Sequence, residues 1–478
     1  MEQITKTLAQ FIADTKFKDL PANVVHEAKR NLLDTIGCAL GGLSTDIGLE
    51  CLELARNLGG KPESSILGTG EKTSCVMASY SNSRMANALD ADDTFPIPAH
   101  FANSTMGATL AMGERQNSSG EEIITAYVLG YELASRIGVG MRPPLFLKEK
   151  KISVYPPLYC LGVFSVFGAL GAAAKLLSLN PEQIQHALGI GGTSCPIPVH
   201  GKWGESTILP TLKYGDVGWC AQLGVTSSLL AGMGTTGYNT IFDGNQHFWR
   251  AYGIDSCDFE GISHELGKRW SILETTYKPW PSCRYTHYPL WLFLKIKKEN
   301  ELSSGEIEKI SIKMGHMGTG TRFRNQNPNG MVSCQFNHPH AITMGALGVE
   351  VGPKWYSREI MGSKQVDEFR KKVQVQHDPE LDKIDLPPGK VIWKLPTSVD
   401  VIAKGNVFRL FTEYTKGDPW TKETYFTDEE LKRKFISFAS SVLSGSEKWR
   451  EQMRSVTDVA FKLEELPNIA ELINSLKP

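Results

Sequence analysis

The sequence has little of what marks the specialised classes of protein. Its 478 residues carry 51 Lys and Arg against 52 Asp and Glu, so they lack the charge excess that nucleic acids or acidic membranes attract. The nine cysteines show no C-x-x-C spacing, which argues against a zinc or iron–sulfur site and indicates reduced thiols in a cytoplasmic protein. Internal repeats and low-complexity tracts are also missing. We therefore expect a globular protein that binds a small molecule, with no nucleic-acid partner, metal or organic cofactor.

Long apolar segments are scarce as well. Met1–Lys6 contains no apolar stretch, so we expect no secretory signal. The segment from Ile152 to Ala174 lacks charge over a length that could cross a bilayer. It also contains prolines, tyrosines, serines and glycines, and no second candidate span exists, so we interpret it as buried helix and expect no membrane association.

Helical periodicity dominates the first half of the chain. Apolar residues recur at helical spacing in the stretches Ile4–Ile12, Val24–Ile36, Ile124–Leu133, Phe164–Leu177 and Val217–Leu230. Asn180, with Pro181 after it and Gln183 nearby, has the pattern of a capped helix start. Between Gly191 and Gly215 the periodicity lapses into Gly, Pro, Ser and Thr, which predicts a long loop of the kind that is often functional.

The character of the chain changes after Trp270. Lys309–Lys313 and Thr397–Ala403 alternate apolar and polar residues with the period of a half-buried strand. The mixed charges of Lys364–Lys383 indicate a solvated helix face and loop, and Thr427–Glu430 supplies the N-cap and acidic first turn of a new helix. These patterns predict a mainly α fold, in which residues 1–272 and 405–478 form a large all-helical domain and 273–404 an inserted, smaller α+β domain.

Arg84–Thr94 is the most unusual stretch. Its first half favours a helix that Pro96 and Pro98 cannot continue. Three carboxylates, a hydroxyl and an imidazole meet at this break, namely Asp90, Asp92, Asp93, Thr94 and His100. Negative charge at the end of a helix costs roughly a few tenths of a kcal/mol per group unless a cation compensates it. We interpret the stretch as a functional site, and the alternative is a hydrated acidic turn in a surface loop.

Three further segments carry polar groups that could complete such a site. Lys213 stands where the long loop meets the next helix, and Lys278 opens the second domain together with Arg284 and His287. Each lysine alone is more often a surface residue, but together the cations indicate a pocket for carboxylates. Gln335–His340 is the third cluster, in which a pair of structural histidines is at least as good an interpretation as catalysis.

Two motif matches do not indicate a function. Gly232–Gly237 satisfies G-x-G-x-x-G but follows a helical pattern, whereas a dinucleotide-binding motif follows a strand. Asp90–Asp93 satisfies the D-x-D-D motif of class II terpene cyclases, yet the chain has no aromatic-rich repeat to line a terpene cavity.

Several segments together resemble the MmgE/PrpD family over nearly the whole chain. They are Leu89–Thr94 with His100, Phe167–Leu177, Lys213–Ala221 and Lys278–His287. The family includes 2-methylcitrate dehydratases, cis-aconitate decarboxylases and iminodisuccinate epimerase. The resemblance implies a helical domain with a smaller lid domain, a homodimer, and a cofactor-free active site in the cleft between the domains.

The same resemblance implies positions for the active-site residues. The family's aspartate, threonine and histidine fall on Asp90, Thr94 and His100, and its two lysines on Lys213 and Lys278. In place of a histidine that decarboxylases carry before a Pro-Pro pair, this chain has a tyrosine, Tyr155 by the local match or Tyr159 by a gap-free alignment. The family's Ala-Gln-Phe-Ser segment also appears as Cys334–Asn337, and both departures argue against cis-aconitate decarboxylation.

The chemistry implied is the making or breaking of a bond at the carbon next to a carboxylate. We expect His100 to act as base or acid with Asp90 beside it, and Lys213 and Lys278 to hold substrate carboxylates. Tyr155 or Tyr159 could donate a proton, and the further candidates for substrate binding are Arg284, His287, Gln335 and His340. The first expectation is a dehydratase of a 2-methylcitrate-like or alkylcitrate-like hydroxy-tricarboxylate. The alternatives are cis-aconitate decarboxylase, an epimerase of an iminodisuccinate-like dicarboxylate, and an inactive member that binds polycarboxylates.

Overall fold

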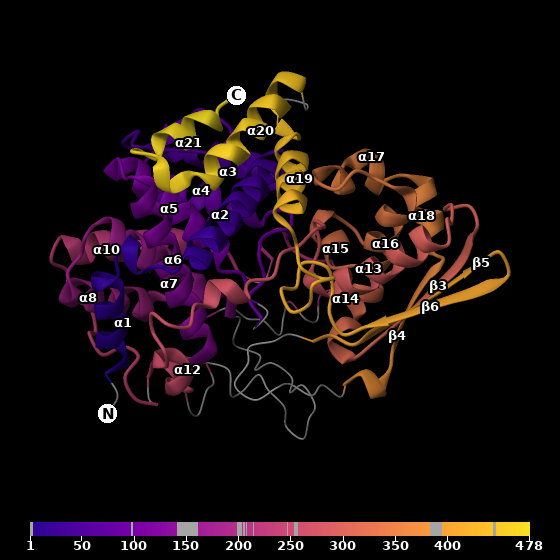
Figure 1. The fold of residues 1–478 in the computed structure, drawn as a ribbon, viewed down its shortest axis with the longest axis horizontal. Helices are drawn as coiled ribbons and strands as arrows, with labels where there is room; N and C mark the ends of the chain where they lie inside the picture. Colours follow the sequence, from indigo (N-terminus) through magenta and orange to yellow (C-terminus); the bar gives the residue numbers. More distant parts are fainter. Residues whose placement is uncertain are drawn as a thin grey trace.

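The computed structural model describes residues 3–96, 99–140, 161–197, 203, 206, 208–213, 215–245, 247–252, 257–382, 394–442 and 446–478. Figure 1 shows a larger, helical part on the left and a smaller part with a sheet on the right. Among the described residues, no helix has both the length and the apolar character needed to span a membrane.

The helical part is built mainly from the first half of the chain. Its helices are α1 (Ile4–Asp14), α2 (Ala22–Leu43), α3 (Asp46–Leu58), α4 (Cys75–Asn87), α5 (Ala102–Gln116), α6 (Gly120–Gly140), α7 (Ser165–Leu176), α8 (Pro181–Ser194), α10 (Val217–Gly232), α11 (Phe248–Ala251) and α12 (Phe259–Ser263). Helices α4, α5, α6, α7 and α10 pack against one another around one apolar core. The helices expected from periodicity are confirmed, and Asn180 caps α8 with Gln183 as the sequence predicts.

The chain returns to this core at its end. The helices there are α19 (Asp428–Ala439), α20 (Glu447–Phe461) and α21 (Ala470–Ser475). Thr427 caps α19 in a reciprocal arrangement with Glu430, as predicted. Helix α19 packs on α2 through Phe435, whereas its Phe438 belongs to the core of the smaller part. Figure 1 shows α19 above the junction of the two parts, so it contacts both.

The smaller part contains a four-stranded sheet in the order β4-β3-β5-β6. Its strands are β3 (Ile307–Met314), β4 (Val373–His377), β5 (Thr397–Ala403) and β6 (Asn406–Thr412). The predicted strands are confirmed within β3 and β5, which pair antiparallel. The other elements of this part are α13 (Arg284–Glu299), α14 (Thr321–Arg324), α15 (Met331–Gln335), α16 (His338–Leu347), α17 (Arg358–Met361) and α18 (Lys364–Arg370). Helix α13 packs on β5, β6 and α16.

Two features of this part differ from what the sequence patterns predict. The stretch Lys364–Lys383 contains a strand, β4, where a loop was predicted, because Val373 is buried on an edge strand that runs parallel to β3. Strand β6 pairs with β5 and so extends the sheet beyond the expected boundary at Lys404. The division into domains and the homodimer stay predictions.

We predict that the contact between α2 and α4 at Gly42 is too close for any side chain. A Cβ at this position would lie 1.9 Å from the carbonyl oxygen of Met85, near the end of α4. Gly42→Ala should therefore lower the free energy of unfolding by about 1–3 kcal/mol, although alanine is the better helix former by about 1 kcal/mol. Urea denaturation measures the change.

Gly305→Ala is the matched control, because a Cβ at Gly305 would meet no atom within 4 Å. It should change the free energy of unfolding by no more than about 0.5 kcal/mol. Equal stability of Gly42→Ala and wild type would contradict the close contact.

Candidate active site

The acidic stretch forms an irregular turn after α4, not the end of a helix. Helix α4 ends at Asn87, before the first acid, and Ala88 is its C-cap. Asp90 has a φ of 53°, in the left-handed region that a non-glycine residue adopts at a cost of about 1–3 kcal/mol. The predicted break in the helix is therefore confirmed, but the turn and not Pro96 produces it.

Asp90 bridges two buried lysines from distant segments. Its Oδ1 accepts a hydrogen bond from Lys213 Nζ at 3.1 Å and its Oδ2 one from Lys278 Nζ at 3.0 Å. Lys278 also donates to the backbone carbonyl of Asp90 at 2.8 Å, and Lys213 donates to that of Asn87. An ammonium group has three donors, so the contacts among the described residues leave each lysine with one N–H for a ligand.

The bridge keeps this carboxyl group charged inside the protein. Burial alone would raise the pKa of Asp90, but the ammonium groups of Lys213 and Lys278 outweigh it and hold that pKa well below its usual range. Burial lowers the pKa of Lys213, and Asp90 opposes this effect. The carboxylate of Asp90 thus pairs with the two lysines, and its expected action beside His100 stays a prediction.

Local structure holds both lysines in place. Lys213 has a φ of 59° and lies just before Asp216, the residue that caps α10 and also pairs with Arg84 of α4. Lys278 follows Thr276, whose backbone exchanges two hydrogen bonds with that of Thr94, at 2.9 and 3.1 Å. Lys278 is thus tied to the acidic turn through its backbone neighbours, and Lys213 to α4 through the side chain of Asp216.

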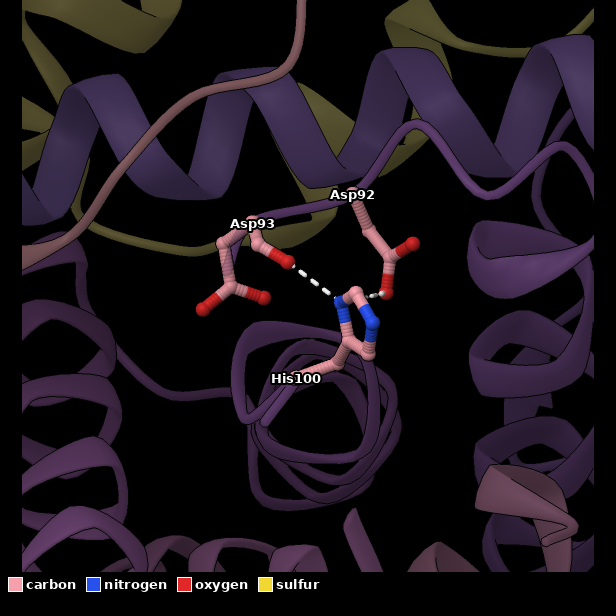
Figure 2. Close-up of side chains that lie close together, drawn as sticks. All are labelled: Asp92, Asp93 and His100. Carbon is pink, nitrogen blue, oxygen red and sulfur yellow. Dashed lines mark hydrogen bonds and ion pairs between the residues drawn. The ribbon is translucent and has the colours of Figure 1, made fainter. Parts of the chain in front are cut away.

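His100 lies just before α5, next to the other two acids (Figure 2). Its Nδ1 is hydrogen-bonded to the carbonyl of Asp93 and lies 3.8 Å from Asp92 Oδ2. A carbonyl can only accept, so Nδ1 carries the proton and Nε2 is the basic nitrogen of the neutral ring. Burial and the nearby ammonium of Lys278 lower the pKa of His100 below the ordinary 6.5. Both effects favour the neutral form of the imidazole.

Asp92 and Asp93 have protein donors of their own. Asp92 accepts from the side-chain amides of Asn87, at 3.1 Å to each oxygen, and of Asn103, at 2.7 Å. Asp93 accepts from Tyr131 Oη at 2.8 Å and from the backbone N–H of Ala102, at the start of α5, at 3.1 Å. Burial and the Asp92 carboxylate raise the pKa of Asp93 to about 7.

The side chains of Asp92, Asp93 and His100 lie close enough together to be tested as a metal site. The donor set does not fit one. Each carboxylate is already bonded to N–H or O–H donors, and the His100 nitrogen that faces them carries a proton. A cation at this point would displace these donors, so we infer no metal centre here.

Thr94 and Gln335 each place an unpaired polar atom near the turn. Gln335, at the end of α15, donates through Nε2 to the carbonyl of Ala88 at 2.8 Å. Its Oε1 and the Oγ1 of Thr94 are buried without a hydrogen-bond partner among the described residues. Because buried polar atoms are nearly always satisfied, these two are candidates to contact a ligand.

The remaining candidates have internal contacts. Arg284 donates to the carbonyl of Tyr277 at 2.6 Å and pairs with Asp418. His340 bonds to the carbonyl of Trp355 at 3.1 Å, and burial lowers its pKa to about 3. His287 is fully buried and bonds to the carbonyl of Ser282 at 3.0 Å. These contacts indicate structural roles, and substrate binding by these residues stays a prediction. Tyr155 and Tyr159 lie outside the described residues.

Five side chains donate hydrogen bonds to backbone carbonyls of the turn, and one of them was not predicted from the sequence. The carbonyls of Asn87, Ala88, Asp90, Ala91 and Asp93 accept hydrogen bonds from Lys213, Gln335, Lys278, Lys434 and His100, in that order. Four of these donors are candidates from the sequence. Lys434 had no local signal, because a lysine in an amphipathic surface helix is ordinary.

We predict that Asp90→Asn lowers the free energy of unfolding by about 3–5 kcal/mol at pH 7, because it leaves two buried ammonium groups without their shared carboxylate. Urea denaturation measures the loss. The pKa of Asp90 is lowered on folding, so the difference is full above pH 3.8, its ordinary value, and shrinks as the pH falls below that.

The matched control is Asp400→Asn. Asp400 pairs with Arg409, whose side chain is 67% exposed. This change should cost less than about 1 kcal/mol. A similar small cost for Asp90→Asn would show that the lysines do not depend on it.

Comparisons with known proteins identify the family of this chain. The MmgE/PrpD N-terminal domain matches residues 6–259 and the MmgE/PrpD C-terminal domain matches residues 280–458. Similar proteins include a cis-aconitate decarboxylase of Mus musculus, 23% identical over 100% of this chain and 94% of its own length. Those of Aspergillus terreus and Homo sapiens are each 21% identical, over 99% and 100% of this chain and 96% and 95% of their own lengths. Since the two domain matches together cover most of the sequence, the chain belongs to the MmgE/PrpD family.

Proposed function

We propose that this protein is a lyase that removes carbon dioxide from an unsaturated tricarboxylate of the cis-aconitate kind. The observation that carries the proposal is the pair of buried lysines, each with one N–H left for a ligand among the described contacts, within electrostatic reach of His100. The names of the similar proteins favour decarboxylation over the dehydration expected first from the sequence. The lyase class rests on the family, and the substrate rests on this proposal.

The lysines bind the substrate and stabilise the charge that develops. A carboxylate of the substrate accepts a hydrogen bond from the remaining N–H of Lys213 or Lys278, while Asp90 keeps both ammonium groups in place. Their pairing with Asp90 partly neutralises the positive charge of the two ammonium groups. Donors that are already oriented stabilise a developing anion without further reorganisation, which is the main source of such catalysis.

The reaction breaks a carbon–carbon bond and makes a carbon–hydrogen bond. Carbon dioxide leaves from one carboxylate, and the electron pair moves through the double bond to the carbon next to another carboxylate. That carbon takes a proton from protonated His100 Nε2, and solvent replaces the proton on the imidazole. The lowered pKa makes His100, once protonated, a ready donor.

Dehydration of a hydroxy-tricarboxylate is the second candidate. The observation that favours it is the tyrosine, Tyr155 or Tyr159, in place of the histidine that decarboxylases carry. In this reaction neutral His100 takes the proton from the carbon next to a carboxylate, and hydroxide leaves with a proton from an acid. The two reactions therefore need opposite protonation states of His100.

Purified protein incubated with cis-aconitate, 2-methylcitrate or iminodisuccinate in D₂O distinguishes these reactions by NMR. Decarboxylation predicts one solvent deuterium bound to product carbon for each carbon dioxide released. Chelator-treated protein should keep its activity, since we propose a reaction without a cofactor. Turnover of 2-methylcitrate alone would replace the proposal with dehydration, and binding without any turnover would support an inactive member.

We predict that His100→Ala lowers kcat by about 10²–10⁴-fold with a modest change in KM, the usual share of general acid–base catalysis. His264→Ala, with an exposed ring, is the control and should keep wild-type kcat. In the wild type the pH transition of kcat/KM should lie below 6.5. Activity falls as the pH rises through this transition if His100 donates a proton, and as the pH drops through it if His100 is a base. Near-wild-type kcat in His100→Ala would remove this residue from the chemistry.

We predict that Lys213→Met and Lys278→Met each raise KM and lower kcat, because each removes both binding and transition-state stabilisation. Loss of one partner of a buried carboxylate typically costs about 2–5 kcal/mol, or roughly 30- to 5,000-fold in kcat/KM. If both lysines bind the same substrate, the double variant loses less than the product of the single losses. Steady-state kinetics tests this, with Lys295→Met of the surface pair with Glu423 as control. Multiplicative losses would place the lysines in independent roles.

A further inference from the structure

Lys434 reaches the acidic turn from α19, near the end of the chain. Its Nζ donates to the carbonyl of Ala91 at 2.7 Å and lies 2.8 Å from Asp34 Oδ1, a carboxylate of α2. The Lys434 side chain is 4% exposed and that of Asp34 is 1% exposed. The ammonium group of Lys434 therefore connects α19 with α2 and with the acidic turn, three segments that are far apart in the sequence. Its contact in the turn is Ala91, the residue between Asp90 and Asp92.

The ion pair alone does not explain this arrangement. A buried pair of this kind contributes little net stability, because removing both charges from water costs about as much as their attraction returns. Burial also lowers the pKa of Lys434, although the attraction of Asp34 outweighs that effect. The additional contact is the hydrogen bond to Ala91, whose buried carbonyl has no ladder or helix partner in the turn.

The position of Ala91 makes this contact relevant to the site. On one side of it, Asp90 holds a left-handed conformation and points its carboxylate at both lysines. On the other side, Asp92 and the carbonyl of Asp93 face His100. Strained conformations persist only where surrounding contacts fix them, and Lys434 fixes the peptide between the two acids.

We propose that Lys434 is a positioning residue of the active site, which holds the Ala91 carbonyl so that Asp90 faces the lysines while Asp92 and Asp93 face His100. Lys434 itself need not touch the substrate. The kinetic part of this inference rests on the lyase proposed above. A small displacement of catalytic groups can cost on the order of 100-fold in rate, so loss of this contact should be visible in kcat.

The test separates positioning from stability with a double variant. Lys434→Met alone would leave Asp34 as an unpaired buried acid, so it is combined with Asp34→Asn, which removes that charge. The chain offers a matched control in Lys29 of α2, which bonds to the carbonyl of Phe461 at 2.8 Å and to Glu464 at 2.6 Å. Lys29→Met with Glu464→Gln therefore removes the same kinds of contact between α2 and the C-terminal segment, away from the turn.

The expected result is a kcat that is about 10- to 100-fold lower in the Lys434 and Asp34 double variant, with KM changed by less than about threefold. The control double variant should keep both constants near those of the wild type, whatever its stability. Wild-type kcat in the first variant, or equal losses in both, would overturn the proposal, because a merely structural pair affects stability and not the turn.

Hydrogen–deuterium exchange provides a readout that needs no activity. Amides of a peptide covering residues 88–96 should exchange faster in the Lys434 and Asp34 variant than in the wild type, and at the wild-type rate in the control variant. Unchanged exchange in the first variant would overturn the positioning role. Faster exchange in a protein that turns over none of the substrates would reject the lyase while keeping the role of Lys434 in the turn.

Discussion

The structure depends on a buried turn in which several backbone carbonyls accept hydrogen bonds from side chains. Its backbone carbonyls at Asn87, Asp90 and Ala91 cannot be left unpaired away from water, and three lysine side chains from distant segments bond to them. The side chains that donate hydrogen bonds to these carbonyls are therefore three cations that lie close to the same turn. The turn and the buried lysines therefore satisfy each other's polar groups in the interior.

The carboxylate of Asp90 makes this gathering of charge possible. Two ammonium groups of like charge would repel each other if they were buried side by side, and Asp90 bridges them while leaving a donor on each. The three charged groups are thus held together by their own contacts. The histidine beside it is kept neutral by burial and by the positive charge of Lys278, and its tautomer is fixed by the Asp93 carbonyl.

Sequence patterns predicted the local elements well and the site only in part. The helices, both central strands and the grouping of Asp90 with Lys213 and Lys278 follow from periodicity, punctuation and the resemblance to a family. The internal pairing of Arg284 with Asp418 could not be predicted, because it depends on a loop after β6 that folds back onto α13. Lys434 was not predicted for a similar reason. Burial of its ammonium group depends on how α19 packs between the two cores, which no local sequence pattern indicates.

A crystal structure of the His100→Ala variant with tricarballylate, a saturated tricarboxylate that cannot react, tests the central claim most directly. The account predicts carboxylate oxygens of the ligand within hydrogen-bond distance of Lys213 Nζ and Lys278 Nζ, with both lysines still bonded to Asp90. A ligand bound away from these two ammonium groups, or one that displaces Asp90 from them, would contradict it.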